Sequence, residues 1–331
     1  MRTAEFIRAL PKAEVHLHFE GAVPWAMVRA HSRGALPEHP AWWADGFRFE
    51  DFKQFRLASQ TCLESLVDVA AYHRAAEAVF GGLRAQNVRY TEVSFDAVRL
   101  AAQELPFTDV IDAIKRGAPP GLTVRVFGAF AYHKHDTTPE DVIAATLNQA
   151  NLDGISLHGD ETVRSTARFA DVFAEARHKR LLTKAHAGEL SGPASITSAL
   201  DLLGVRRIEH GVRAIEDEAL VERLAADGVT LDMCPWSNVR LAVVRDLTAH
   251  PIRRLHARGV RVTVSTDDPT VFGRSLSEEL ASLVDDLGFA LPEVAQLQSN
   301  AFAVAAMPAD ARAAVQRELD ALVAEAESGR A

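Results

Sequence analysis

The chain has few cysteines and no long apolar segment. Only two of its 331 residues are cysteine, Cys62 and Cys234, too few for a disulfide framework or a thiolate metal cluster. No run reaches the roughly 18 apolar residues that a transmembrane helix needs. The N-terminal residues mix charged with apolar side chains and lack the apolar segment of a signal peptide. We therefore expect a globular protein of the cytoplasm.

The chain also lacks an excess of basic residues. It has 36 Lys and Arg against 45 Asp and Glu, which gives a net charge of -9. A general nucleic-acid-binding protein needs a basic face to neutralise phosphates. Neither nucleic acid nor a membrane is therefore the expected partner, whereas a small molecule with local contacts fits. The sequence leaves the oligomeric state open.

A short, β-branched apolar run recurs along the chain, and a longer helical pattern usually follows it. The expected strands are Glu14–Phe19, Val88–Phe95, Thr123–Ala131, Gly154–His158, Leu181–Ala187, Arg207–Gly211, Val229–Cys234 and Arg261–Thr266. The expected helices include Ala70–Ala85, Pro139–Asn151, Ser165–Lys179, Ala194–Leu203, Asp217–Asp227 and Pro251–Arg258. This alternation predicts parallel strands joined by crossover helices. Eight such units favour an α/β fold, a (β/α)8 TIM barrel that forms one domain over residues 1–331.

Two segments fall outside the alternation. Residues 31–72, between the first two strands, contain several aromatic side chains and predict a helical insertion that caps the barrel mouth. After Asp268 the pattern is helical to the end, and Pro308–Ser328 has a plausible amphipathic stripe. We expect this helical C-terminal tail to pack on the barrel exterior or in a subunit contact.

Polar side chains gather where the predicted strands end. The carboxyl ends of barrel strands face one common mouth. Side chains alternate along a strand, so His16 and His18 point to the same side. His186 ends the fifth strand, and Asp267 follows the eighth on its polar face. Three histidines and one aspartate suit zinc and leave room for a water.

Each of these histidines alone is as readily explained as an ordinary hydrogen-bonded residue. Ligand-type side chains at several strand ends together are not well explained by chance. Other candidates are weaker: His133, His135 and His158 follow strands on the mouth side, and Cys234 is expected in the core. Histidines in helical or loop patterns are expected on the surface; these are His73, His178, His250 and His256.

The motifs together resemble the adenosine deaminase family of the amidohydrolase superfamily. They are Pro11-Lys-Ala-Glu-Val-His-Leu-His-Phe-Glu-Gly21, Gly159-Asp-Glu161, His186-Ala-Gly-Glu189, Arg207-Ile-Glu-His-Gly211, Cys234-Pro-Trp-Ser-Asn238 and Ser265-Thr-Asp-Asp-Pro269. The resemblance covers nearly the whole chain in order. It implies hydrolytic removal of a purine 6-amino group at one zinc ion per chain, held by His16, His18, His186 and Asp267.

The resemblance also implies roles for the neighbouring residues. Glu189 would protonate ring N1, and His210 would assist the attacking water. Asp268 would bond ring N7, and the backbone N–H of Gly159 would bond N3. Ser237 would sit behind His210 and fix the orientation of its ring.

The substrate motifs are mixed. Family members that act on adenosine usually have Asp where this chain has Glu20, and members that act on adenine usually have Leu where it has Trp236. Residues 271–279 look closer to the nucleoside enzymes. The pattern resembles deaminases of 6-amino-6-deoxyfutalosine in menaquinone biosynthesis, and we rank that substrate before adenosine and adenine. Candidate cations for its carboxylate are Arg56, Lys134 and Arg164.

Two other functions compete with this hypothesis. A two-metal amidohydrolase commonly needs a bridging lysine at the fourth strand, and Ser156-Leu-His-Gly159 supplies none. A non-catalytic nucleoside-binding relative would be marked by loss of Glu189 or of a ligand, and the full set is present.

Overall fold

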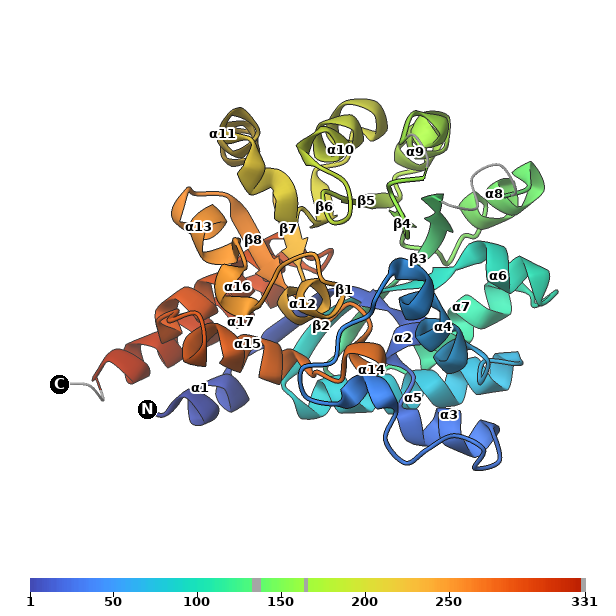
Figure 1. Ribbon diagram of the computed structural model, residues 1–331, viewed down its shortest axis with the longest axis horizontal. Helices are drawn as coiled ribbons and strands as arrows, with labels where there is room; N and C mark the ends of the chain where they lie inside the picture. Colours follow the sequence, from blue (N-terminus) through green and yellow to red (C-terminus); the bar gives the residue numbers. More distant parts are fainter. Residues whose placement is uncertain (133–137, 164–165, 329–331) are drawn as a thin grey trace.

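The computed structural model describes residues 1–132, 138–163 and 166–328 and contains one parallel sheet of eight strands. The strands are β1 (Lys12–His18), β2 (Val88–Asp96), β3 (Thr123–Ala131), β4 (Gly154–His158), β5 (Leu182–Ala187), β6 (Arg207–His210), β7 (Thr230–Met233) and β8 (Arg261–Val264). They follow one another in sequence order, and each neighbouring pair is parallel. The predicted TIM barrel is therefore confirmed (Figure 1).

The barrel closes where the chain continues beyond β8. Asp267 forms a parallel bridge with Leu17 of β1. The backbone N–H of His18 donates to the carbonyl of Asp267 at 2.9 Å, and the N–H of Asp267 donates to the carbonyl of His16 at 3.1 Å. The Ser265 hydroxyl oxygen accepts from the His16 N–H at 3.1 Å. Hydrogen bonds at this seam thus join the first strand to the end of the last.

β1 begins earlier than its sequence predicts. The expected start was Glu14, but the strand starts at Lys12, whose side chain is fully buried. The Lys12 ammonium donates to the carbonyls of Ile7, Leu10 and Gln86. A buried lysine is rare unless its charge is paired or hydrogen-bonded, so the lysine masked the start of the strand.

Helices surround the strands on the outside (Figure 1). Those that follow the strands are α6 (Ala97–Ala102), α7 (Phe107–Arg116), α8 (Glu140–Leu147), α9 (Ala170–His178), α10 (Pro193–Ser198), α11 (Glu218–Ala226), α12 (Pro235–Arg240) and α13 (Ile252–Ala257). Short helical turns accompany them: η3 (Thr166–Phe169), η4 (Ala199–Leu203), η5 (Val212–Glu216) and η6 (Leu247–Ala249). Among the described residues, no helix combines the length and apolarity that a membrane span requires.

The predicted helical insertion lies between β1 and β2. It comprises α2 (Phe19–Ala22), α3 (Trp25–His31), η1 (Ala41–Trp43), α4 (Phe52–Leu63) and α5 (Val69–Ala85). The Asp51 carboxylate caps the start of α4 by accepting from the Gln54 N–H at 2.7 Å. The ring of Phe55 stacks on Phe272 at a centroid distance of 5.5 Å, which attaches α4 to the segment after β8.

The C-terminal region is helical, as predicted. It comprises α14 (Pro269–Phe272), α15 (Leu276–Asp285), α16 (Leu291–Val304) and α17 (Ala309–Ser328). α16 contacts β8 and β1, and α17 packs on α16 and buries Val315, Leu319 and Ala326. The N-terminal helix α1 (Thr3–Ala9) contacts α15 and α17, so the two ends of the chain lie on the same side of the molecule (Figure 1).

Candidate active site

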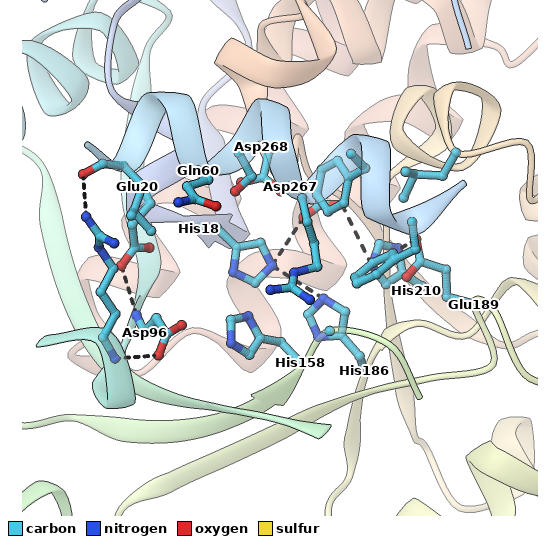
Figure 2. A pocket seen from close by; sticks show the side chains of 18 residues that line it. His18, Glu20, Gln60, Asp96, His158, His186, Glu189, His210, Asp267 and Asp268 are labelled. Atoms are coloured by element: carbon cyan, nitrogen blue, oxygen red, sulfur yellow. Dashed lines mark hydrogen bonds and ion pairs between the residues drawn. The ribbon is translucent and has the colours of Figure 1, made fainter. Parts of the chain in front are cut away.

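A cavity of about 300 Å³ lies at the carboxyl ends of the strands. Figure 2 shows histidines and Asp267 at one end of it, and Glu20, Gln60 and Asp96 at the other. Most of the predicted site residues line this cavity; they are His18, Glu20, Gly159, His186, Glu189, His210, Asp267 and Asp268. The α4 residues Phe52, Phe55, Arg56, Ser59, Gln60 and Leu63 line it too. The insertion therefore forms part of the cavity wall.

The predicted ligand residues lie in one cluster. Nε2 of His18 is 3.3 Å from Nε2 of His186 and 3.2 Å from Oδ1 of Asp267. Nε2 of His16, which lies below the cavity, is 3.7 Å from the same oxygen. Ligand atoms of His16, His186, His210 and Asp267 lie within 4.8 Å of one another, and so do those of His18, Asp267 and Asp268. The cluster thus also includes His210 and Asp268.

Hydrogen bonds on the outer nitrogens orient the three histidine rings. Nδ1 of His16 lies 3.2 Å from the Asp232 carbonyl, and Nδ1 of His186 lies 3.0 Å from the Glu209 carboxylate. Nδ1 of His18 lies 3.0 Å from the hydroxyl of Ser94 in β2. When Nδ1 carries the proton, the Nε2 lone pair faces the cluster.

The inner side of the cluster is suited to a cation. Nε2 of His16 is buried and has no hydrogen-bond partner, a costly state for a polar atom unless something binds it. Burial alone would raise the pKa of Asp267, but the hydrogen bond with His18 and the neighbouring histidines hold that pKa far below its usual range. An ionised carboxylate beside imidazole nitrogens is a typical donor set for a divalent metal.

A layer of buried ion pairs lies inside the barrel beneath the cluster. The ammonium of Lys184 in β5 is 3.0 Å from Glu209, and Arg207 pairs with Glu92 and with Asp232 at 2.6 Å each. Burial would raise the pKa of Glu209, but the charge of Lys184 together with His16 and His186 keeps that pKa well below normal. Glu209 therefore stays an anion and can hold the Nδ1 proton of His186.

The loop that carries Glu189 is held by a second carboxylate. Glu161 accepts backbone N–H groups from four successive residues at 2.7–2.9 Å, and also the hydroxyl of Ser195; the four are Gly188, Glu189, Leu190 and Ser191. Hydrogen bonds to a charged acceptor are about twice as strong as neutral ones. Glu161 therefore fixes the backbone from which the Glu189 side chain enters the cavity.

Glu189 itself is surrounded by conditions that favour its neutral form. The side chain is buried, and the residue is 4% exposed. Burial, followed by the negative charges of Asp267 and Glu161, raises the pKa of Glu189 well above its usual value. A carboxyl group in this state can give a proton to a bound molecule at neutral pH.

The environment of His210 differs from the prediction. Ser237 was expected behind His210, but its hydroxyl donates to Oδ2 of Asp267 at 2.7 Å. The next residue, Asn238, contacts His210 instead, with its amide nitrogen 3.2 Å from Nδ1. His250, predicted on the surface, is buried and lies 3.1 Å from the Asn238 side-chain oxygen. No local sequence pattern around His250 indicates that its side chain is buried.

Two further carboxyl groups line the cavity: Glu20, which follows β1, and Asp268, which follows β8. Burial and the charge of Asp267 raise the pKa of Asp268 well above normal. The Glu20 carboxylate accepts the backbone N–H of Asp96 at 2.9 Å, and burial raises the pKa of Glu20 as well. Both side chains line the same cavity, so two more carboxyl groups with raised pKa values face its interior.

Of the cations predicted near the mouth, Arg56 lines the cavity. Lys134 and Arg164 lie outside the described residues, as do His133 and His135. Arg99 of α6 lines the cavity although the sequence did not single it out. Glu161, Glu209 and Asn238 belong to the family motifs, but only the structure reveals that each supports a neighbouring site residue.

Comparison with known proteins agrees with this geometry. The sequence pattern of the family described as Adenosine deaminase matches residues 11–322. An adenine deaminase from Rhodospirillum rubrum is 36% identical over 313 residues, covering 89% of this chain and 92% of the relative. One from Cupriavidus necator is 36% identical over 331 residues, covering 96% and 93%. The crystal structure of adenine deaminase from Arthrobacter aurescens matches with a TM-score of 0.87 and 28% identity, covering 95% and 99%. The chain belongs to the adenosine deaminase family and is a metal-dependent aminohydrolase that acts on purines.

Proposed function

We propose that the chain uses one zinc ion to hydrolyse the 6-amino group of an adenosine-type nucleoside. The observation that carries this proposal is that His16, His18, His186 and Asp267 lie in one cluster next to Glu189, whose pKa is raised by burial. In the overall reaction the C6–N bond breaks, a C6–O bond forms from water, and ammonia leaves.

The donor set supports zinc as the metal. Tetrahedral zinc with bonds of about 2.0–2.1 Å places neighbouring nitrogen ligands about 3.3 Å apart. The two Nε2 atoms of His18 and His186 are 3.3 Å apart. A solved amidohydrolase from Burkholderia ambifaria with the same fold contains bound Zn (23% identity, TM-score 0.84, covering 98% of this chain and 94% of that one). When bound, zinc supplies a water whose pKa is lowered to about 7.

The remaining steps fall to side chains of the cavity. Attack at C6 moves electrons onto ring N1, and Glu189 delivers the proton that N1 then needs. Its raised pKa keeps that proton available. His210, whose Nε2 lies 3.5 Å from Glu189 and 3.8 Å from Asp267, faces the attacking oxygen.

Two groups orient the purine ring. N7 has a lone pair and no proton, so Asp268 must be protonated to bond it, and its raised pKa favours that form. The backbone of Gly159 lines the same cavity and would offer its N–H to N3. Because the pocket contacts both sides of the ring, the reactive C6 is directed towards the metal cluster.

The far end of the cavity supports a substrate larger than the base. Besides Glu20, the lining includes Gln60, Asp96 and two cations, Arg56 and Arg99. Guanidinium groups suit a carboxylate, and 6-amino-6-deoxyfutalosine has one in place of the 5′-hydroxyl. We propose this nucleoside as the preferred substrate and adenosine as the second. We also propose that residues 1–331 form one domain in which residues 31–72 cover the mouth of the barrel.

Free adenine is the alternative substrate, and a separate observation favours it. The relatives from Rhodospirillum rubrum and Cupriavidus necator are both named adenine deaminase. Glu20 also matches the residue that such enzymes often carry. Free adenine has no carboxylate that Arg56 or Arg99 could bind.

A panel of substrates tests the proposal. The ultraviolet change from the 6-amino to the 6-oxo purine is followed for 6-amino-6-deoxyfutalosine, adenosine and adenine with the zinc-loaded enzyme. We expect the highest kcat/KM for the acidic nucleoside and a specific loss of that preference in Arg99→Met. A preference of the wild type for free adenine would overturn the nucleoside assignment, and absence of turnover with all three would overturn the deaminase assignment.

A further inference from the structure

A chain of hydrogen bonds leads from a backbone amide on α13 to His210. The N–H of Ile252 lies 3.2 Å from Nδ1 of His250, and Nε2 of His250 lies 3.1 Å from the side-chain oxygen of Asn238. The amide nitrogen of Asn238 lies 3.2 Å from Nδ1 of His210. All three side chains are buried, with His250 4%, Asn238 0% and His210 1% exposed.

The first donor fixes the direction of the whole chain. A backbone N–H can only donate, so Nδ1 of His250 must accept, and a neutral imidazole then carries its proton on Nε2. Burial lowers the pKa of His250 to about 3, which keeps the ring neutral. Nε2–H of His250 donates to the Asn238 oxygen, and this orients the amide so that its NH2 group faces His210.

The other side of Asn238 agrees with this orientation. Its amide nitrogen also lies 3.4 Å from Oε1 of Glu189, so one NH2 group serves two acceptors. A reversed amide would place its oxygen against Nδ1 of His210 and Oε1 of Glu189, and would turn the NH2 group towards the N–H of His250. The second of these arrangements opposes two N–H donors, so the N–H of His250 selects the amide orientation.

We propose that Asn238 and His250 are positioning residues that hold His210 with its proton on Nε2. Nδ1 of His210 accepts from Asn238, so Nε2 carries the proton and presents an N–H to the reacting centre. His210 then meets the attacking oxygen as a hydrogen-bond donor. The inference rests on the proposed deaminase reaction for its functional meaning, but the tautomer is a property of the resting enzyme.

Variants at position 250 test the hydrogen-bond relay from Ile252 through His250 and Asn238 to His210 by kinetics. In His250→Leu the donor to Asn238 is lost, and we expect kcat to fall about 10- to 100-fold, the usual effect of removing a residue that orients an active-site ring. KM and zinc content should stay near wild type. His250→Gln keeps an N–H donor close to the former Nε2 and should restore most of kcat. His256→Leu is the matched control, because His256 lies in α13 and packs on Phe289, and it should retain wild-type kcat.

Asn238→Asp replaces the NH2 donor that faces His210 with an acceptor oxygen and leaves the shape of the side chain almost unchanged. A carboxylate oxygen then faces Nδ1 of His210 and draws the proton to that nitrogen. We expect a loss of kcat at least as large as in His250→Leu, with zinc still bound. Wild-type kcat in Asn238→Asp, or equal loss in His250→Gln and His250→Leu when both fold, would overturn the relay.

The tautomer can be observed directly in the resting zinc-loaded enzyme. Long-range ¹H–¹⁵N spectra of protein labelled at histidine distinguish the protonated from the unprotonated ring nitrogen, and His210→Gln identifies the His210 signals. We expect protonated Nε2 and unprotonated Nδ1 in the wild type. The opposite pattern would overturn the inference even if His250→Leu fails to fold. This spectrum needs no substrate, so it tests the tautomer independently of the reaction. If the enzyme shows the expected pattern but no deaminase turnover, the proposed function is refuted and the tautomer stands.

Discussion

Gly21 and Asp268 approach each other so closely that only glycine fits at position 21. A Cβ added there would lie 1.6 Å from Oδ1 of Asp268, far inside contact distance. Gly21 lies in α2, whereas Asp268 directly precedes α14 and lines the cavity. The carboxylate proposed to bond ring N7 therefore owes its position to a missing side chain on a neighbouring segment.

Gly21→Ala should displace the Asp268 carboxylate. Since a misplacement of about 1 Å near a reacting centre can cost about 100-fold, we expect kcat/KM to fall by roughly that factor while zinc content is unchanged. Gly81→Ala is the matched control, because a Cβ at position 81 of α5 meets nothing within 4 Å. It should keep wild-type activity and gain about 0.5–1 kcal/mol of stability. Full activity in Gly21→Ala would remove Asp268 from substrate binding.

Glu161→Gln should loosen the loop that carries Glu189. The neutral amide offers one oxygen to donors that now share a carboxylate, and hydrogen bonds to charged groups contribute about 1.5–3 kcal/mol each. We expect a lower Tm and a large fall in kcat, measured by thermal unfolding and steady-state assay. Asp160→Asn is the control, since Asp160 accepts local hydrogen bonds from the backbone N–H and the hydroxyl of Thr162. A wild-type kcat in Glu161→Gln would contradict the positioning role.

Glu209→Gln should weaken the metal site without touching the metal directly. The variant loses the anion that holds Nδ1 of His186, and loss of such a partner typically lowers metal affinity about 10- to 100-fold. Graded chelation followed by metal analysis measures this affinity, and one equivalent of zinc should restore activity to both proteins. Glu175→Gln, at an exposed ion pair with Lys179, should titrate like the wild type.

Activity should fall on the alkaline side of neutrality because Glu189 works in its protonated form. Its pKa in the folded protein is raised, so the proton is present below that pKa and is lost as the pH rises through it. The profile of kcat/KM against pH should therefore show an alkaline limb. Glu189→Gln should keep the metal but lose about 100- to 10,000-fold in kcat, the usual share of a general acid. Retention of wild-type turnover in that variant would exclude the role.

The fold could be predicted because buried parallel strands leave a strong trace. The expected runs Thr123–Ala131 and Gly154–His158 coincide with β3 and β4, since strands covered on both faces read as continuous apolar segments. Lys12 was not predicted as part of β1, because the hydrogen bonds that permit its burial go to carbonyl groups brought near it by the tertiary structure. No local pattern shows such partners.

The site was predictable where strand geometry determines it and not where contacts cross between loops. Period-two alternation placed His16 and His18 on one side of β1. Ser237 and Asn238 were harder, because they are adjacent in α12 and successive helical side chains point about 100° apart. The burial of His250 depends on its contact with Asn238 across a loop, a relationship that spacing alone does not reveal.

The seam of the barrel has a consequence for how the protein is made. The chain positions that meet there, His16 and Ser265, are 249 residues apart. During synthesis one edge of β1, which carries His16 and His18, therefore lacks its partner until almost the whole polypeptide has emerged. Only then do barrel closure and assembly of the proposed cation site occur, in the same step. A chain ended before β8 would have an open sheet and an incomplete ligand set, so truncated products could neither close nor retain the ion.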